Sequence, residues 1–194
     1  VEDRIVLVET ELYKIITNKK SNLTLEYFTS EMSAIKQLLI DEHQSLYVSK
    51  VNSLLNKIHL FGFHFANLDI RQDSRKHDEF FNEMVKTLLE NGSKIFPINY
   101  FELSENEQVF VLSNVKGYVD LNLIKDKDAF KALNTMKVIK TIQETNGEKA
   151  ANRYIISNNQ TALNVMQLYA MLKLVAFQGD LTVDIGPLFE TITD

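Results

Sequence analysis

The sequence predicts a helix-rich α/β fold with parallel strands. Three short apolar runs, near residues 65–71, 153–157 and 181–189, each lead into a helical pattern or into the end of the chain. Strands separated by helices are typical of parallel βα units. Three parallel strands cannot close a barrel, and they leave both outer edges of a sheet open. We therefore expect either a partner chain on those edges or a slice of a larger fold.

Composition limits the class of protein and its partners. The chain has 194 residues, 45% hydrophobic and 24% charged, as in a soluble globular protein of one large or two small domains. Its net charge of −5 favours neither nucleic acid nor an anionic membrane as a partner. The absence of cysteine excludes disulfides and thiolate metal sites. It agrees with a reducing compartment, and we expect a cytoplasmic protein.

The beginning of the chain carries no targeting signal that we recognise. Val1 to Arg4 has no basic region before an apolar one. No apolar run approaches the roughly 18 residues that a membrane helix needs. We expect no signal peptide and no membrane association. Because the first residue is not Met, we expect a processed protein or a piece of a longer one.

Residues 1–60 show only helical periodicity. Apolar residues recur every three to four positions, which predicts helices over residues 4–19, 24–40 and 44–60. We expect residues 1–60 to form a helical segment before the strands. Residues 61–194 are expected to hold all three strands as a partial barrel-like sheet, and both parts to belong to one domain.

Residues 61–194 alternate between strand and helix patterns. Phe61, Phe63 and Phe65 alternate into the first predicted strand, and we interpret these rings as core rather than as a stacking surface. Caps and turns bound the helices that follow. The predicted helices and their signals are 75–90 with Asn91-Gly92, 104–113 with the capping box of Ser104 and Glu107, 126–144 with Asn146-Gly147, and 161–177 with Thr161.

Arg71 is the main candidate for binding chemistry. It comes at the carboxyl end of the first predicted strand, where α/β sheets and barrels bind their ligands. The arginine fork suits a phosphate or a carboxylate. The alternative is a structural arginine that is paired with Asp69 or Asp73.

The other two predicted strands also end in polar residues. Glu190 follows the last strand and is suited to a hard cation such as Mg²⁺, which usually takes only one or two protein carboxylates. The alternative for Glu190 is a solvated glutamate at the start of a loop. Ser157 ends the second strand, before the polar loop Asn158-Asn159-Gln160, and such loop residues need no function.

Supporting roles fall to neighbours of these positions. His77 comes shortly after the first strand end and either supports the site or caps the next helix, and we favour the supporting role. Asp69, Gln72 and Ser157 are further supporting candidates. The sequence has no histidine pair with zinc spacing, no glycine-rich phosphate loop and no nucleophile elbow.

Three motifs resemble the phosphoenolpyruvate carboxylase family. Phe61-Gly62, then Leu68-Asp69-Ile70-Arg71-Gln72-Asp73-Ser74 and His77, is similar to the family's Phe-Gly … Leu-Asp-Ile-Arg-Gln-(Glu/Asp)-Ser … His signature. Tyr154-Ile155-Ile156-Ser157, with Thr161 and Val165, is similar to its Tyr-Val-Ile-Ser strand and the next helix. Pro187-Leu188-Phe189-Glu190-Thr191, with Asp194, is similar to its Pro-Leu-Phe-Glu-Thr-Leu-Asp strand end. The likeness covers about residues 30–194.

This resemblance implies a fold, a reaction and two residue roles. It implies about three βα units of a (β/α)₈ TIM-type barrel with extra helices, cut from a much longer enzyme that is a homotetramer. With Mg²⁺ or Mn²⁺, the family converts phosphoenolpyruvate and bicarbonate to oxaloacetate and phosphate, which replenishes the tricarboxylic acid cycle. Bicarbonate attacks the phosphate, and carboxyphosphate then supplies CO₂ to the enolate. Arg71 falls on the arginine that binds phosphoenolpyruvate, and Glu190 on one of two acidic metal ligands.

Several of the family's other motifs have no match in this chain. These are Thr-Ala-His-Pro-Thr, Gly-Tyr-Ser-Asp-Ser, which brings the second metal carboxylate, and the loop Phe-His-Gly-Arg-Gly-Gly. Asn158-Asn159-Gln160 also replaces the usual Met-Ala-Lys. We therefore expect the fragment to be inactive alone and, with open sheet edges, prone to self-association. The alternatives are a non-catalytic helical interaction module with barrel-like strands and another enolate-handling barrel enzyme.

Overall fold

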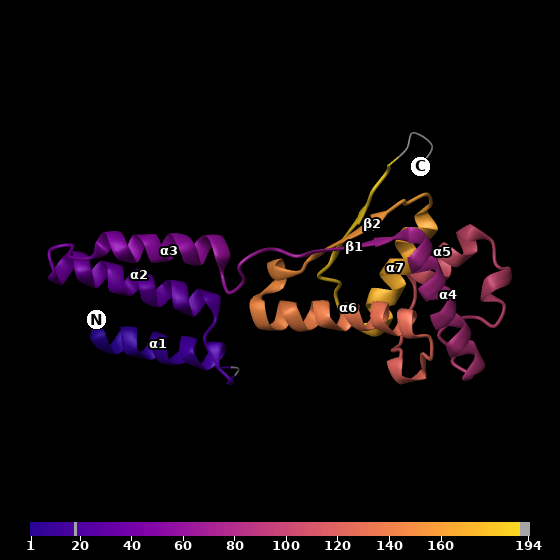
Figure 1. The fold of residues 1–194 in the computed structure, drawn as a ribbon, viewed down its shortest axis with the longest axis horizontal. Helices are drawn as coiled ribbons and strands as arrows, with labels where there is room; N and C mark the ends of the chain where they lie inside the picture. The colour runs from indigo at the N-terminus through magenta and orange to yellow at the C-terminus, as the bar shows by residue number, and fades with distance from the viewer. Residues whose placement is uncertain (18, 191–194) are drawn as a thin grey trace. The chain divides into compact units, whose positions relative to one another are not determined.

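The chain forms two compact units in a computed structural model that describes residues 1–17 and 19–190. The units are Val1–Ala66 and Asn67–Asp194, and each is considered by itself (Figure 1). The predicted helix-rich α/β fold is confirmed, because the described residues hold many helices and one three-stranded parallel sheet. No helix within the described ranges is both long enough and apolar enough to cross a membrane.

The first unit consists of the helices α1 (Glu2–Ile16), α2 (Leu25–Glu42) and α3 (Val48–Phe61). Thr24 caps α2, because its hydroxyl oxygen accepts a hydrogen bond from the Tyr27 N–H at 3.1 Å. The helix α3 begins later than predicted, because Gln44, Ser45 and Tyr47 adopt positive φ angles that a helix does not allow. Apolar faces of the three helices, together with Leu23 just before α2, supply the buried core: Val8, Leu23, Phe28, Met32, Ile35, Leu39, Leu55 and Ile58.

The first strand does not lie where the phenylalanine pattern placed it. The predicted strand was residues 65–71, whereas β1 is Asp69–Asp73. Phe61 ends α3, and Gly62 turns the chain with φ +54. The rings of Phe61 and Phe65 stack at 5.7 Å between centroids, and Phe65 is 88% exposed. The core interpretation is therefore wrong for these two rings, while Phe63 does pack against the core of the first unit.

The second unit alternates strands and helices around one core. The helix ends confirm the predicted signals: Gly92 and Gly147 have positive φ just after α4 and α6, Ser104 and Glu107 form a capping box, and Thr161 caps α7. The last strand is shorter than the predicted 181–189. The elements are α4 (Ser74–Glu90), α5 (Glu105–Ser113), α6 (Lys127–Asn146), β2 (Arg153–Ser157), α7 (Ala162–Val175), β3 (Asp184–Pro187) and three 3₁₀ turns, Tyr100–Glu102, Leu121–Leu123 and Glu148–Ala150.

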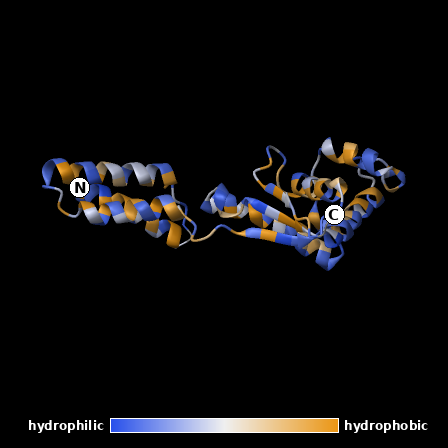
Figure 2. Cartoon of the chain, turned by 90° about the horizontal axis from the view of Figure 1, so that it is seen from above, coloured by the Kyte–Doolittle hydropathy of each residue, from blue (hydrophilic) through white to orange (hydrophobic). Residues whose placement is uncertain are grey.

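The two faces of the sheet have different surroundings. The strand order is β1-β2-β3, with Ile70 opposite Tyr154 and Tyr154 opposite Ile185. These residues belong to one face, which packs against the helical core of the unit. The helices show hydrophobic and hydrophilic residues on different sides (Figure 2). Because side chains alternate along a strand, Arg71 and Arg153 belong to the opposite, more exposed face.

Candidate functional site

The carboxyl ends of the three strands are tied together by hydrogen bonds. The Ser74 hydroxyl, just past β1, donates to the Asn158 carbonyl, just past β2, at 2.5 Å. The Asn159 N–H donates to the Leu188 carbonyl, just past β3, at 3.3 Å. Ser74 is buried, so this link is shielded from water. The strand-end loops therefore form one connected rim, to which the sequence alone assigned no function.

A left-handed residue shapes this rim. Asn158 has φ +53, a conformation that asparagine tolerates better than most residues. The turn aims its carbonyl at Ser74. The side chain of Asn159 is buried, and its Oδ1 has no hydrogen-bond partner among the described residues. Asn158 and Asn159 therefore belong to the turn that holds β1 next to β2.

Arg71 and Glu190 meet on the exposed side of the sheet. The Arg71 Nη2 lies 3.3 Å from the Glu190 Oε1, which links β1 with the segment that follows β3. The predicted position of Arg71 at a strand end is wrong, because it is the third of five residues in β1. Glu190 comes three residues after β3 ends, not directly after it. The structure nevertheless brings both predicted site residues together.

This ion pair is open to solvent. The side chains of Arg71 and Glu190 are 57% and 43% exposed. Ion pairs at this exposure contribute only about 0–1 kcal/mol, because water and salt screen them. An anionic ligand can therefore replace the Glu190 carboxylate on the Arg71 guanidinium at little cost in stability. The arrangement holds a forked cation ready for a phosphate or a carboxylate.

The structural alternative for Arg71, a pair with Asp69 or Asp73, is not observed. Asp69 Oδ1 lies 3.2 Å from the Nε of Arg153 on the neighbouring strand. Asp73 accepts hydrogen bonds from the N–H and the guanidinium of Arg75, at 2.7–2.9 Å. These bonds hold the pKa of Asp73 down at about 2. Both aspartates therefore have other arginines as partners.

His77 supports the sheet from its buried side. Its Nε2 lies 3.1 Å from the Tyr154 hydroxyl of β2, and its Nδ1 has no partner among the described residues. Burial lowers the pKa of His77 to about 4, against a smaller opposite effect of Asp73, so the ring is neutral near pH 7. His77 is not the helix cap, because Asp73 caps α4. It contacts β2 on the face opposite that of Arg71 and does not contribute to the exposed surface.

Gln72 and Ser157 are the remaining candidates for supporting the site. The Gln72 Oε1 accepts a hydrogen bond from the Asp73 N–H at 3.0 Å, so this side chain folds back on its own strand. Ser157 is half-buried and lies opposite Asp73 in the strand register.

The described part of the chain offers a metal ion few ligands. Within residues 1–17 and 19–190, no group of three or more histidine, aspartate or glutamate side chains is placed to hold a metal. Glu190 is a half-exposed carboxylate, which fits the single protein ligand that Mg²⁺ often accepts beside its waters. The predicted motif positions Thr191 and Asp194 lie outside the described residues.

The fold and this site define a class of protein. It is an α/β protein with a parallel sheet, whose exposed face presents an arginine paired with a carboxylate. The family model for phosphoenolpyruvate carboxylase matches residues 6–194. The chain therefore belongs to the phosphoenolpyruvate carboxylase family. The match begins well before residue 30, where the sequence motifs first indicated the likeness.

Curated relatives show how much of such a protein the chain represents. It is 27% identical over 179 residues to the phosphoenolpyruvate carboxylase of Prochlorococcus marinus subsp. pastoris, covering 88% of this chain and 17% of the relative. It is 29% identical over 175 residues to the phosphoenolpyruvate carboxylase of Synechococcus sp., covering 86% of this chain and 16% of the relative. The chain thus spans about a sixth of the length of these relatives.

Proposed function

We propose that this chain is part of a phosphoenolpyruvate carboxylase, to which it contributes an arginine for phosphoenolpyruvate and a carboxylate for the metal ion. The complete enzyme would convert phosphoenolpyruvate and bicarbonate to oxaloacetate and phosphate in the cytoplasm, as a homotetramer. The observation that carries the proposal is the contact of Arg71 with Glu190 across the sheet, in a chain of this family. The non-catalytic interaction module is not favoured, because the family match covers nearly the whole chain.

The sheet is compatible with three consecutive βα units of a barrel. Its strands are parallel and adjacent in chain order, and its helices pack against one face. The other face carries Asp69, Arg71 and Arg153, which would line the interior and the mouth of a closed barrel. The outer strands β1 and β3 would pair with further strands of the longer protein.

In this proposal each residue has a separate task. The Arg71 guanidinium binds and orients the anionic groups of phosphoenolpyruvate through paired N–H donors. Glu190 would hold Mg²⁺ or Mn²⁺ through a carboxylate oxygen. The bound metal ion would polarise the phosphoryl group and stabilise negative charge as the bond to phosphorus breaks. His77 and Tyr154 position the strands from behind.

The test replaces Arg71 in a longer protein that contains this segment. We expect Arg71→Ala to lower kcat/KM for phosphoenolpyruvate by about a hundredfold or more, because a charged donor to the reacting group is lost. Arg71→Lys should recover part of this, since it restores the charge without the fork. Oxaloacetate is measured by coupling to malate dehydrogenase.

The matched control is Arg75→Ala. Arg75 is a neighbouring exposed arginine that pairs with Asp73 on the surface. Its removal should leave kcat/KM within about twofold of the parent. If Arg71→Ala behaved like Arg75→Ala, the proposed role of Arg71 would be wrong. Residues 1–194 alone should form no oxaloacetate, because the second metal carboxylate of the family has no match here.

A further inference from the structure

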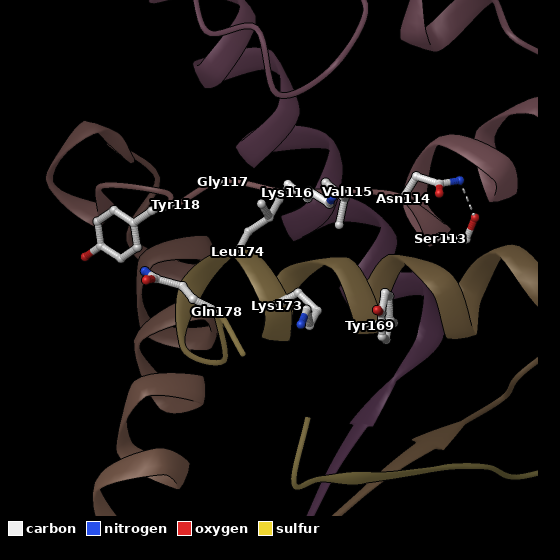
Figure 3. A pocket seen from close by; sticks show the side chains of 10 residues that line it. All are labelled: Ser113, Asn114, Val115, Lys116, Gly117, Tyr118, Tyr169, Lys173, Leu174 and Gln178. Atoms are coloured by element: carbon white, nitrogen blue, oxygen red, sulfur yellow. Dashed lines mark hydrogen bonds between the residues drawn. The ribbon is translucent and has the colours of Figure 1, made fainter. Parts of the chain in front are cut away.

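A hollow lies away from the strand ends, between α7 and the segment that follows α5 (Figure 3). It measures about 620 Å³, within the range of roughly 300–1,000 Å³ that small-molecule sites occupy. The segment from Ser113 to Tyr118 forms one wall, and Tyr169, Lys173 and Gln178 contribute from α7 and the loop after it. None of these residues belongs to the Arg71 site.

The charge of this hollow is opposite to that of the chain. Lys116 and Lys173 line it, and no aspartate or glutamate is among its lining residues. The whole chain has more acidic than basic residues, 26 against 21. Lys137 is not a lining residue, although its Nζ lies 3.0 Å from the hydroxyl of the lining residue Tyr118. The hollow is therefore a local concentration of positive charge on an acidic protein, which attracts anions.

The polar groups of the hollow are mainly hydrogen-bond donors. The Lys173 ammonium is held by the Gly179 carbonyl, which uses one of its three N–H groups and leaves the others for a ligand. Gln178 adds a side-chain amide, whereas the Asn114 amide already donates to the Phe110 carbonyl and the Ser113 hydroxyl. The backbone N–H groups of Lys116, Gly117 and Tyr118 donate to no other described residue.

The shape of the wall is fixed by packing. Gly117 has φ +136, and a Cβ there would lie 2.9 Å from the Ile95 side chain, so only glycine fits without displacement. The Val119 N–H donates to the Leu174 carbonyl at 2.9 Å, which anchors the segment to α7. Val115 and Leu174 are buried and form an apolar floor. The lysines are thus presented on a preformed wall rather than on a free loop.

We propose that this hollow binds a small organic anion, with a phosphate or carboxylate group toward Lys116 and Lys173 and its carbon skeleton on the apolar floor. The site is separate from the Arg71 site and does not depend on the proposed carboxylase function. The same positive charge would accept either type of oxyanion, and the experiment distinguishes them.

The experiment is an NMR titration of the ¹⁵N-labelled 194-residue chain. The probes are inorganic phosphate, glycerol 3-phosphate and succinate, each to about 10 mM, tenfold above a millimolar Kd. We expect saturable shifts at Gly117, Tyr118 and the Gln178 side-chain amide. A phosphate preference would identify a phosphorylated ligand, and a succinate preference a carboxylated one. Shifts that stay linear, or no shift with any probe, would overturn the proposal.

Two variants and a control test the lysines. Lys116→Ala and Lys173→Ala should each weaken binding about tenfold, because a charge-assisted contact is removed. Lys116 is exposed, so its loss should leave the fold intact even if Lys173→Ala perturbs α7. Lys149→Ala removes one charge from another exposed position in the same unit and should leave Kd unchanged. If Lys149→Ala weakened binding as much as Lys116→Ala, only the overall charge would matter and no site would exist.

Discussion

The two units differ in how completely they bury their apolar residues. In the second unit, Phe81, Met84 and Leu133 are fully buried. In the first unit, the core side chains are 2–9% exposed, and an apolar groove of about 560 Å³ runs along its helices. The difference shows that amphipathic periodicity alone does not close a core. Helices that cover a parallel sheet bury their own apolar faces and the sheet face that they contact. Three helices without a sheet leave part of their apolar surface uncovered.

The largest expected effect on stability comes from truncating a buried core side chain. Leu133→Ala in the second unit should destabilise it by about 3 kcal/mol, because a fully buried side chain is replaced by a cavity. Leu39→Ala in the first unit, at a site 9% exposed, should cost about 1–2 kcal/mol, since the looser surroundings relax. Hydrogen exchange read by mass spectrometry reports each unit separately. Equal losses in the two units would contradict the contrast in packing.

The next effect is the pH dependence of the second unit. The pKa of buried His77 is about 4 when folded and about 6.5 when unfolded, so the unfolded chain binds more protons between these values. Stability is therefore present above pH 6.5 and is lost as the pH falls. Between pH 7.5 and 5 this amounts to about 2 kcal/mol. Urea unfolding of the parent and of His77→Phe at both pH values measures it.

Asp73, the charged group near His77, sets the lower limit of the pH range for this experiment. The pKa of Asp73 is lowered to about 2, so its own contribution to stability is lost only below about pH 4. The first unit has no fully buried histidine, since His43 and His59 are exposed and His64 is half-buried. A pH-dependent loss of the same size in His77→Phe would show that another group is responsible.

A smaller effect compares two glycines with positive φ, one in each unit. Gly117→Ala places a Cβ 2.9 Å from Ile95 in the tightly packed unit, whereas Gly62→Ala meets Leu25 at 3.4 Å in the looser one. Both suffer backbone strain of about 1 kcal/mol, and Gly117→Ala adds a steric clash. We expect a larger loss of thermal stability for Gly117→Ala. Ile95→Ala should reduce the difference between the two, and no reduction would exclude the clash as its cause.

The smallest expected effects are at helix caps. Asp126 accepts hydrogen bonds from two N–H groups of α6, and Thr24 accepts one from α2. Asp126→Ala and Thr24→Ala should each cost about 1 kcal/mol, because capping is local and does not depend on core packing. Circular dichroism melts of both variants check this. If only one of the two substitutions lowered the melting temperature, the units would differ in the stability of their helix ends as well as in core packing.

The sequence predicted helices and their ends better than strand positions. Thr161, Ser104 and the glycines after α4 and α6 act through contacts with near neighbours, so their effect is visible in the sequence. The alternating Phe61, Phe63 and Phe65 follow a strand period, yet they bridge a helix end and a turn. Periodicity cannot distinguish these cases when the run is short.

The sequence predicted which residues form the candidate site, but it did not predict how they are arranged in space. Arg71 and Glu190 were candidates because each follows an apolar run, and the family resemblance implied their roles. Their contact depends on the order β1-β2-β3 and on strand bounds, which only the three-dimensional structure gives. The link from Ser74 to Asn158 was missed, since a serine at a helix start normally suggests a cap. The local sequence signal is the asparagine at 158, a residue type that tolerates the left-handed conformation found there.

The connections within the sheet have a consequence for how the second unit folds. β1 and β2 pair only after the chain has passed through α4, α5 and α6, whereas β2 and β3 are joined by α7 alone. Closing a long loop costs more chain entropy and slows folding. We therefore expect the segment from β2 to β3 to assemble before β1 is added to its edge. In that order, the contact of Arg71 with Glu190 would form only when β1 joins the sheet.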